Sequence, residues 1–506
     1  LRFPSIERDN SMQQPKRLIE VDLPIRKISE HAQREKNLKS SHLSTLHIRW
    51  ARRPLAACRA VICASIWPDP VDDSCPPRFR SEAAAIFCKF ASKVARDKNL
   101  AERCSESTWN LCMNLAKNNY SMDLESPNGL HQLRTALLAF ISDFANWDNS
   151  STDAYLEVSR ELTRVAHESI GGMSGTLPLV VDPFAGGGSI PLETLRVGAD
   201  AFASDLNPIP VLLNKIVLEY IPRYGTHLID EIIKWSKWLK DRAEQKLSQF
   251  YPEDDNGVVP IAYLWARTIH CEGPGCGTEL PLIGLPWLSK KEKNRVALGV
   301  LPNEKEKHID FKLFSPKADS DLPPPISRRL SATCPLCGFT TPYKNVREQI
   351  RSKEGGTKDP RLLAVILRKT SGDRVFRLPK QSDFLAVRKA SETLTGFQKH
   401  FTTNSELSIP NEEFPTWYSG VFNPGLWNIT TWGRLFTDRQ LLSLLTFCSI
   451  VREAKQRMLE RGLDAHLVEA IVTCLSLPVS NLSHYLSSVS IWAQDHMISA
   501  FIQGSG

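Results

Sequence analysis

In the segment Leu177-Pro178-Leu179-Val180-Val181-Asp182-Pro183-Phe184-Ala185-Gly186-Gly187-Gly188-Ser189, an apolar strand runs into a glycine loop that opens a helix. The helix continues to Arg196, and a second strand follows as Ala201-Phe202-Ala203-Ser204-Asp205. This order is typical of an α/β protein with a doubly wound parallel sheet, which binds ligands at the carboxyl ends of its strands. We therefore expect a Rossmann-like core with Asp182 at its binding edge.

Asp205 points to a nucleoside as the ligand of this loop. An acid at the end of the second strand, 17 residues past the last glycine, is placed to accept hydrogen bonds from both ribose hydroxyls. A dinucleotide site usually has G-x-G-x-x-G, whereas here Asp-Pro-Phe precedes three consecutive glycines. The alternative interpretation is a glycine-rich turn that only lets strand and helix pack. The order of strand, loop, helix, strand and terminal acid favours the ligand site.

The loop Asp182-Pro183-Phe184-Ala185-Gly186-Gly187-Gly188 closely resembles the D-P-F-x-G-x-G signature of amino-group DNA methyltransferases. This resemblance implies S-adenosylmethionine as the cofactor. Its methionine part would lie in the glycine loop, with Asp182 beside the amino group and Asp205 on the ribose. Asn207 and Pro208 also fit the second motif of that family.

Most of the chain is similar to one group in particular, the bacterial and archaeal adenine-specific DNA methylases that contain a zinc ribbon. The N-terminal resemblance is carried by Ile19-Glu20-Val21-Asp22-Leu23-Pro24, Arg34-Glu35-Lys36, Ser44-Thr45-Leu46-His47 and Trp50-Ala51-Arg52-Arg53-Pro54-Leu55-Ala56. In many DNA methyltransferases, a segment just upstream packs beside the methionine end of the cofactor, so residues 44–56 are candidates for that position. The alternative is a basic helix that caps the sheet, with Arg52 and Arg53 on DNA phosphates.

The resemblance also implies what the whole protein does. It implies methylation of DNA, most often at adenine N6, within a restriction-modification or anti-phage defence system whose other proteins are further partners. Because the sequence shows no export signal, we expect the cytoplasm as its location. The expected fold class is thus α/β: a partial Rossmann-like S-adenosylmethionine-dependent methyltransferase core with a helical insertion and a zinc-ribbon insertion.

Paired cysteines give a second chemical signal. Cys271-Glu-Gly-Pro-Gly-Cys276 and Cys334-Pro-Leu-Cys337 form one C-x4-C and one C-x2-C turn, which can bring Cys271, Cys276, Cys334 and Cys337 around a structural Zn²⁺. The 57 intervening residues predict an elaborated zinc ribbon. Four core cysteines without metal are the alternative. Lys290, Lys291, Lys293 and Arg295 lie in the same region, where they can either reach DNA or remain solvated.

No catalytic residue can be assigned. DNA amino-methyltransferases hold the target amine with Asp, Asn or Ser followed by Pro-Pro and an aromatic residue. Adjacent prolines occur only at Pro76-Pro77 and at Pro323 to Pro325, and neither fits. We therefore expect the chain to be a fragment that ends before the catalytic motif, binds cofactor at best weakly and transfers no methyl group.

Composition narrows the class of protein. The net charge is +7, and residues 16–59 alone hold eleven Lys and Arg against four acids, a field that suits a polyanion such as DNA. No stretch approaches the roughly 18 uninterrupted apolar residues of a membrane helix, so we expect no membrane partner. Two other functions remain open: a methyltransferase that acts on RNA or protein, and a non-catalytic nucleic-acid-binding module.

The pattern along the chain predicts its elements and regions. Helices are expected at 25–35, from Pro54 to 66, throughout 81–169, at 438–461 and at 463–477, and strands at 308–314 and 362–368. The expected regions are a basic N-terminal segment at 12–70, a helical insertion at 71–175, the cofactor-binding core at 176–265, the zinc ribbon at 266–345 and a mixed region at 346–506.

Overall fold

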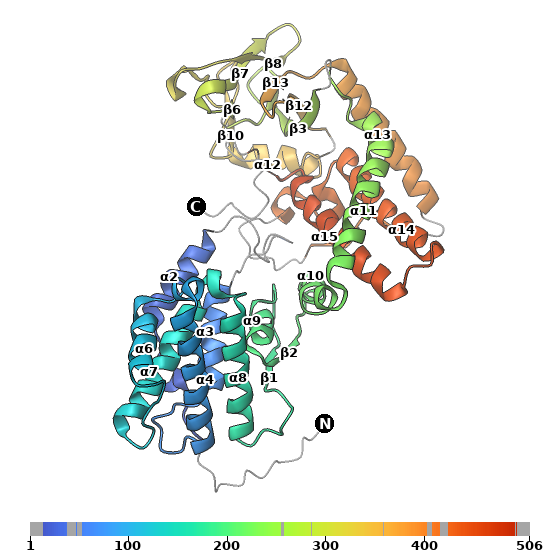
Figure 1. Cartoon of the computed structure of the whole chain (residues 1–506). Helices are drawn as coiled ribbons and strands as arrows, with labels where there is room; N and C mark the ends of the chain where they lie inside the picture. Colours follow the sequence, from blue (N-terminus) through green and yellow to red (C-terminus); the bar gives the residue numbers. More distant parts are fainter. Residues whose placement is uncertain are drawn as a thin grey trace, which may run out of the picture. The chain divides into compact units, whose positions relative to one another are not determined.

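The chain divides into two compact units, Leu1–Leu228 and Ile229–Gly506 (Figure 1). The structure is a computed structural model that describes residues 14–37, 47, 53–254, 258–284, 286–357, 359–401, 407–414, 424–490 and 492. The division falls inside helix α11 (Ile221–Leu247), three residues after Gly225, whose φ of 52° and ψ of −131° interrupt the helical geometry. Each unit is described by itself.

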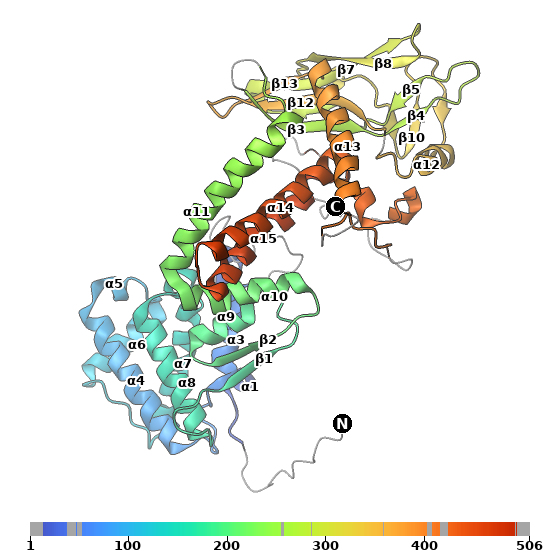
Figure 2. The ribbon, with the colours of Figure 1, turned by 90° about the vertical axis from the view of Figure 1, so that its right-hand side faces the viewer.

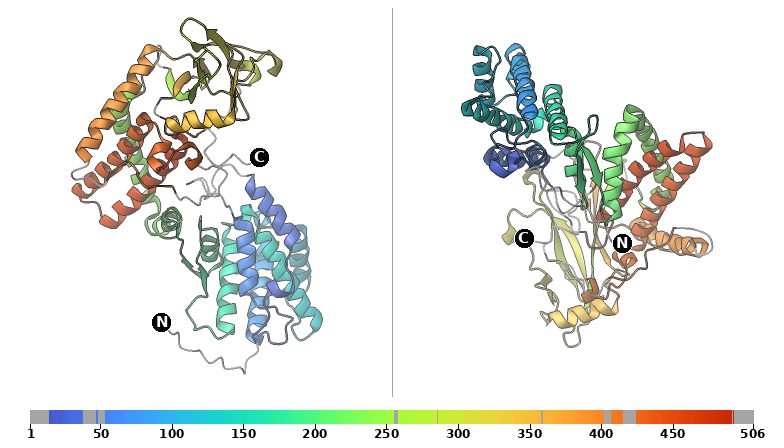
Figure 3. Two further views of the ribbon diagram at one scale, coloured as in Figure 1. Left: turned by 180° about the vertical axis from the view of Figure 1, so that it is seen from behind. Right: turned by 90° about the horizontal axis from the view of Figure 1, so that it is seen from below.

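The first unit begins with a helical layer in which α4, α6, α7 and α8 lie side by side (Figures 1 and 3). Prolines open two of its helices, at Pro77 and Pro127, where a missing amide hydrogen costs nothing. The helices are α1 (Leu18–Val21), α2 (Ile25–Lys36), α3 (Leu55–Ile66), α4 (Pro77–Arg96), α5 (Lys98–Ala101), α6 (Glu106–Lys117), α7 (Pro127–Phe144) and α8 (Asp153–Ser169). The helices expected at 25–35, 54–66 and 81–169 are confirmed.

One hydrophobic core extends from Leu18 to Val197. At its centre, Phe90, Phe140 and Tyr155 pack with ring centroids 5.3 to 5.6 Å apart. The N-terminal helices and the helices after residue 71 share this core, because α3 packs against α7, α8 and α9. The finer regional boundaries drawn from the sequence stay predictions.

A parallel βαβ unit follows the helical layer (Figure 2). Strand β1 (Leu179–Asp182) pairs in parallel with β2 (Asp200–Ala203), with α9 (Ser189–Val197) between them, so the expected order of strand, loop, helix and strand is confirmed. One face of the pair packs on α9. On the other face Leu179, Val181 and Phe202 are 62%, 56% and 56% exposed. Among the described residues this sheet has two strands, so the full doubly wound sheet stays a prediction.

Two short helices lead from β2 to the end of the first unit. Asn207 caps the helix α10 (Pro208–Asn214), and the π-helix η3 (Lys215–Tyr220) follows without a break. The apolar side chains of Leu213, Ile216 and Tyr220 are buried.

The second unit contains small antiparallel sheets between residues 258 and 378. Strands β3 (Val259–Ala266), β12 (Arg361–Arg368) and β13 (Arg374–Arg377) form one sheet in the order β13-β12-β3. A second contains β6 (Trp287–Ser289), β7 (Val296–Asn303) and β8 (His308–Phe314). The smaller sheets pair β4 (Thr268–His270) with β5 (Glu279–Pro281), and β10 (Ser331–Thr333) with β9 (Ser327–Arg328) and β11 (Thr340–Thr341). The strands expected at 308–314 and 362–368 are confirmed.

Helices complete the second unit. The helix α12 (Tyr343–Ser352) packs on β4 and β10, while α11, α13 (Gln381–Phe401) and α14 (Asp438–Glu460) share a hydrophobic core. The last helix, α15 (Ala465–Tyr485), lies beside α14 (Figure 2). Among the described residues, α15 alone has the length and hydropathy of a membrane span. Leu467, Val468 and Ile471 of this helix are buried, and 33% of its most apolar 18-residue window is buried in all.

Candidate metal centre and glycine loop

The loop between β1 and α9 requires glycine at two positions. Gly186 and Gly188 have φ angles of 52° and 82°, a region that side chains rarely adopt. The Gly188 amide donates to the carbonyl of Ala185 at 2.9 Å, which turns the chain into α9. A Cβ on Gly188 would lie 2.6 Å from Oδ1 of Asn214, whereas a Cβ on Gly187 would meet no atom within 4 Å. Gly187 thus presents bare backbone to open space.

The two predicted acids lie at the ends of neighbouring strands. Asp182, only 8% exposed, accepts the amide of Phe184 at 3.1 Å. Asp205 accepts the amides of Gly186 and Asn207, each at 2.9 Å. Asp205 therefore holds the glycine loop to the end of β2, a positional role that sequence reasoning did not anticipate.

Asn207 and Asn214 fix the helix that follows β2. The side-chain oxygen of Asn207 accepts the amide of Ile209 at 2.9 Å, so Asn207 is the N-cap of α10. The side-chain amide of Asn214 donates to the carbonyls of Gly186 at 3.2 Å and Pro210 at 2.8 Å. No sequence motif marks Asn214, because its partner Gly186 lies 28 residues away.

Apolar side chains flank the loop on its open side. Phe184 is 78% exposed and Leu206, directly after Asp205, is fully exposed. Exposed aromatic and aliphatic side chains beside backbone amides and carboxylates are the kinds of group that line small-molecule sites. The predicted residues 182–188, 205 and 207 are thus brought together around one loop.

Helix α3 begins at a capping carboxylate and packs against the helix that follows the glycine loop. Glu35 accepts the amides of Leu55 and Ala56 at 2.8 and 3.0 Å, which caps the start of the helix. Burial raises the pKa of the Cys58 thiol to about 12, and the negative charges of Glu193 and Asp182 act in the same direction. Helix α3, whose first turn contains Leu55 and Ala56 of the 44–56 segment, packs against α9, the helix that follows the loop. Residues 44–46 and 48–52 of that segment lie outside the described residues.

The four predicted cysteines form one cluster. The sulfur atoms of Cys271 and Cys337 are 3.5 Å apart, those of Cys276 and Cys334 are 3.8 Å apart, and all four lie within 4.8 Å of one another. A tetrahedral zinc site with Zn–S bonds of about 2.3 Å places its sulfurs about 3.8 Å apart, whereas a disulfide needs about 2.05 Å. The cluster can therefore hold a metal ion.

Each cysteine pair lies in a turn that ends with a left-handed glycine. Gly277 follows Cys276 with φ of 65°, and Gly338 follows Cys337 with φ of 73°. The Gly273 amide lies 3.4 Å from the sulfur of Cys271, and N–H groups aimed at a sulfur stabilise its thiolate. Hairpin strands β4–β5 and β10–β11 carry the two turns, and Val346 and Ile350 of α12 join the same core.

The ionisation of the four cysteine thiols is consistent with a bound metal cation. Burial opposes ionisation at Cys276, but hydrogen bonds from the hydroxyl and amide of Thr278 overcome it and lower the pKa of this thiol to about 6. Burial raises the pKa of Cys271 and of Cys334. Four adjacent thiolates repel one another, so a bound cation is what would allow all four to ionise.

The fold and the site define a chain with a parallel β-loop-α-β unit and, in its other unit, a four-cysteine cluster able to hold a metal ion. Residues 22–87 match a family described as a protein of unknown function, DUF1156. This match covers α2, α3 and the first half of α4. No curated protein and no solved structure matches the chain.

Proposed function

We propose that the chain is the cofactor-binding and metal-binding part of an S-adenosylmethionine-dependent DNA methyltransferase, acting on adenine N6. The observation that carries the proposal is the glycine loop between Asp182 and Asp205. It combines two carboxylates, a bare backbone position at Gly187 and the exposed side chain of Leu206. Nucleoside cofactors with a charged amino-acid tail need these kinds of group: acceptors for hydroxyls and an ammonium, and apolar contacts for a base.

The residues of the loop fit the parts of the cofactor. Asp182 accepts the amide of Phe184, and Asp205 accepts the amides of Gly186 and Asn207. A carboxylate offers about four acceptor positions. In this proposal, the two carboxylates accept hydrogen bonds from the ammonium and ribose hydroxyl groups of the ligand. When bound, S-adenosylmethionine supplies an activated methyl group on its sulfonium. Residues 182–188, 205 and 207 bind and orient it in this proposal, and no residue of the chain is assigned to the transfer step.

We further propose that the metal in the cysteine cluster is Zn²⁺ with a structural role. Four thiolates in tetrahedral spacing leave no open coordination position for a substrate or water. Partners in this proposal are DNA and other proteins of a restriction-modification or anti-phage system. The resemblance of residues 19–56 and 182–188 to adenine-specific methylases supports this assignment.

Calorimetric titration tests the cofactor. We expect the chain to bind S-adenosylmethionine but not NAD, and Asp205→Ala to weaken binding by about 1.5 to 3 kcal/mol through the lost ribose hydrogen bonds. Because Asp205 also holds the loop, Gly187→Ala is the sharper variant. Its added methyl group enters only open space in the protein, so it should weaken cofactor binding while the thermal stability stays unchanged.

Two results would contradict the proposal. One is that S-adenosylmethionine, supplied to millimolar concentration, fails to bind the folded chain. The other is that Gly187→Ala binds it as well as the unaltered chain does.

A further inference from the structure

The β-rich part of the second unit carries a strong positive charge. Residues 258–378 contain 21 Lys and Arg against 12 Asp and Glu, an excess of nine positive charges, whereas the whole chain has a net charge of +7. Residues 16–59 carry a further excess of seven positive charges, so the remaining parts of the chain are acidic. This concentration of charge in one part of the fold identifies the surface to inspect for a polyanionic partner.

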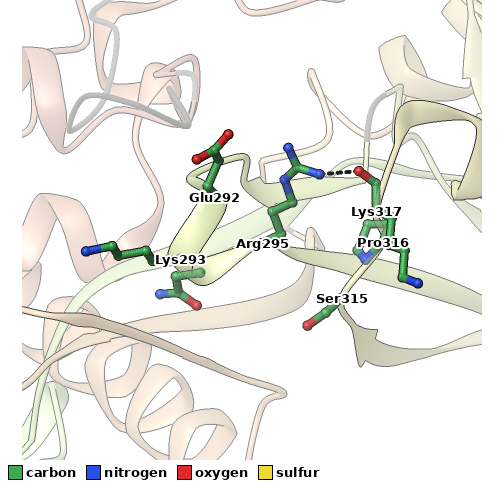
Figure 4. A pocket seen from close by; sticks show the side chains of 7 residues that line it. Glu292, Lys293, Arg295, Ser315, Pro316 and Lys317 are labelled. Carbon is green, nitrogen blue, oxygen red and sulfur yellow. Dashed lines mark hydrogen bonds between the residues drawn. The ribbon is translucent and has the colours of Figure 1, made fainter.

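Tertiary contacts gather part of this charge at one end of the β6-β7-β8 sheet. Asn294 donates to the carbonyl of Arg374 at 2.8 Å, and Arg295 donates to the carbonyl of Lys317 (Figure 4). Residues 292–295 and 315–317 thus line a hollow of about 560 Å³, and the contact of Asn294 holds the Arg374 backbone beside the first of these segments. We call the cations at this end the basic rim: Lys290, Lys291, Lys293, Arg295, Lys317 and Arg374.

Two of the acids beside the basic rim are already engaged, whereas Glu292 lines the hollow with an exposed carboxylate that lowers the local positive charge by one (Figure 4). Asp319 accepts the indole N–H of Trp287 at 2.7 Å and pairs with Lys290 at 3.3 Å. Asp321 accepts the amides of Lys317 and Ala318 at 2.8 and 3.0 Å.

Among the described residues, three lysines of the basic rim form no ion pair that would neutralise their charge. Within the described part of the chain, no carboxylate lies within 4.0 Å of the ammonium groups of Lys291, Lys293 or Lys317. The side chains of all three lysines are exposed, and those of Lys293 and Lys317 point away from each other around the hollow (Figure 4). This arrangement suits a row of separate anionic groups better than one small anion.

The surroundings of the basic rim favour nucleic acid over a membrane. No large apolar side chain is exposed in residues 287–295, 315–319 or 366–374, whereas membrane-surface sites combine cations with exposed apolar residues. The indole N–H of Trp492 donates to the carbonyl of Leu288 at 2.8 Å, and its ring centroid lies 5.4 Å from the guanidinium carbon of Arg374. Trp492 therefore contacts both the backbone next to the basic rim and one of its cations.

We propose that the basic rim binds the phosphate backbone of duplex DNA. This inference rests on the proposed function for DNA as the partner and adds the surface that holds it. Phosphate contacts from lysines supply sequence-independent affinity and position a duplex without reading its bases. The metal-binding turns lie in the same β-rich part, so the cluster would stabilise the fold that carries the rim.

Fluorescence anisotropy with a labelled duplex of arbitrary sequence tests the rim in the full chain. Lys291→Gln/Lys293→Gln/Lys317→Gln should weaken binding about tenfold or more at moderate salt, and should reduce the slope of log K against log salt by about 2 to 3. The matched control is Lys305→Gln/Lys344→Gln/Lys389→Gln, which removes the same charge from exposed lysines elsewhere in the unit. Lys305 lies in the β7–β8 turn, at the opposite end of that hairpin.

The control should bind DNA within about twofold of the unaltered chain. Equal losses in the two triple variants, or unchanged binding in the rim variant, would overturn the proposal. So would binding to vesicles containing phosphatidylserine in place of DNA. Titration with S-adenosylmethionine is independent of these measurements, so failure of the rim and failure of the cofactor proposal can be told apart.

Discussion

The guanidinium of Arg59 on α3 donates to the carboxylate of Glu193 on α9 at 2.6 Å, and both side chains are fully buried. Arg59 also donates to the carbonyl of Phe144 at the end of α7. The pair thus joins α3, α7 and the helix that follows the glycine loop. Because 134 residues separate the two partners, neither is recognisable from the sequence pattern.

We predict that Glu193→Gln lowers the free energy of unfolding of the first unit by about 3 to 5 kcal/mol, because it leaves the buried Arg59 charge without its partner. Urea unfolding followed by tryptophan fluorescence measures this. The matched control is Glu30→Gln, which breaks the exposed Arg26–Glu30 pair and should cost less than about 0.5 kcal/mol. Equal effects of the two variants would contradict the structural role of the Arg59–Glu193 pair.

Gly188→Ala should destabilise the loop and the start of α9. The φ angle of 82° and the contact of 2.6 Å between an added Cβ and Asn214 predict a cost of about 1 to 3 kcal/mol. Gly187→Ala is the control, since it has no such contact, and thermal unfolding should separate the two variants. A Gly188→Ala chain as stable as the control would show that the loop adopts another conformation.

Removal of two ligands should release the metal. We expect Cys334→Ser/Cys337→Ser to lose about one zinc ion per chain and to destabilise the surrounding small sheets, because binding energy in such sites is folding energy. Elemental analysis of purified protein measures the zinc content. Cys448→Ser/Cys474→Ser, which alters two cysteines outside the cluster, should retain the metal. Unaltered protein that contains no zinc would refute the assignment.

Asp254 should make the stability of the second unit depend on acid pH. Burial opposes its ionisation, but ion pairs with Lys380 and Arg377 lower its pKa below the ordinary 3.8. Its contribution is therefore present above pH 3.8 and is lost as the pH falls through the lower folded-state value.

Asp254→Asn should cost about 1 to 3 kcal/mol at neutral pH, and the difference from the unaltered chain should disappear in strong acid. Urea unfolding at a series of pH values measures both effects. Asp373→Asn, which removes a carboxylate with no cation within 4.0 Å among the described residues, should show no such trend. A difference that persists unchanged into acid would contradict the ion-pair explanation.

Local patterns predicted many of the elements. The helices at Ile25–Lys36 and Asp438–Glu460 and the strand His308–Phe314 follow from periodicity within their own residues. The sequence pattern did not predict that the sheet face with Val181 and Phe202 is exposed. Whether a sheet face is covered depends on which distant elements pack on it. The sequence named Lys290, Lys291, Lys293 and Arg295 as residues that can reach DNA or remain solvated. It did not indicate Lys317 and Arg374, which join them only through the long-range contacts of Arg295 and Asn294.

The sequence by itself determined the glycine loop and the cysteine cluster. Positive φ angles at Gly186 and Gly188 and the two short cysteine turns depend on residues within a few positions of one another. Only the tertiary structure decided that Asp205 holds the loop, that Asn214 lies beside it, and that Arg59 of α3 pairs with Glu193 of α9. These contacts join segments far apart in the chain, and their formation depends on how helices and strands pack, which no local pattern specifies.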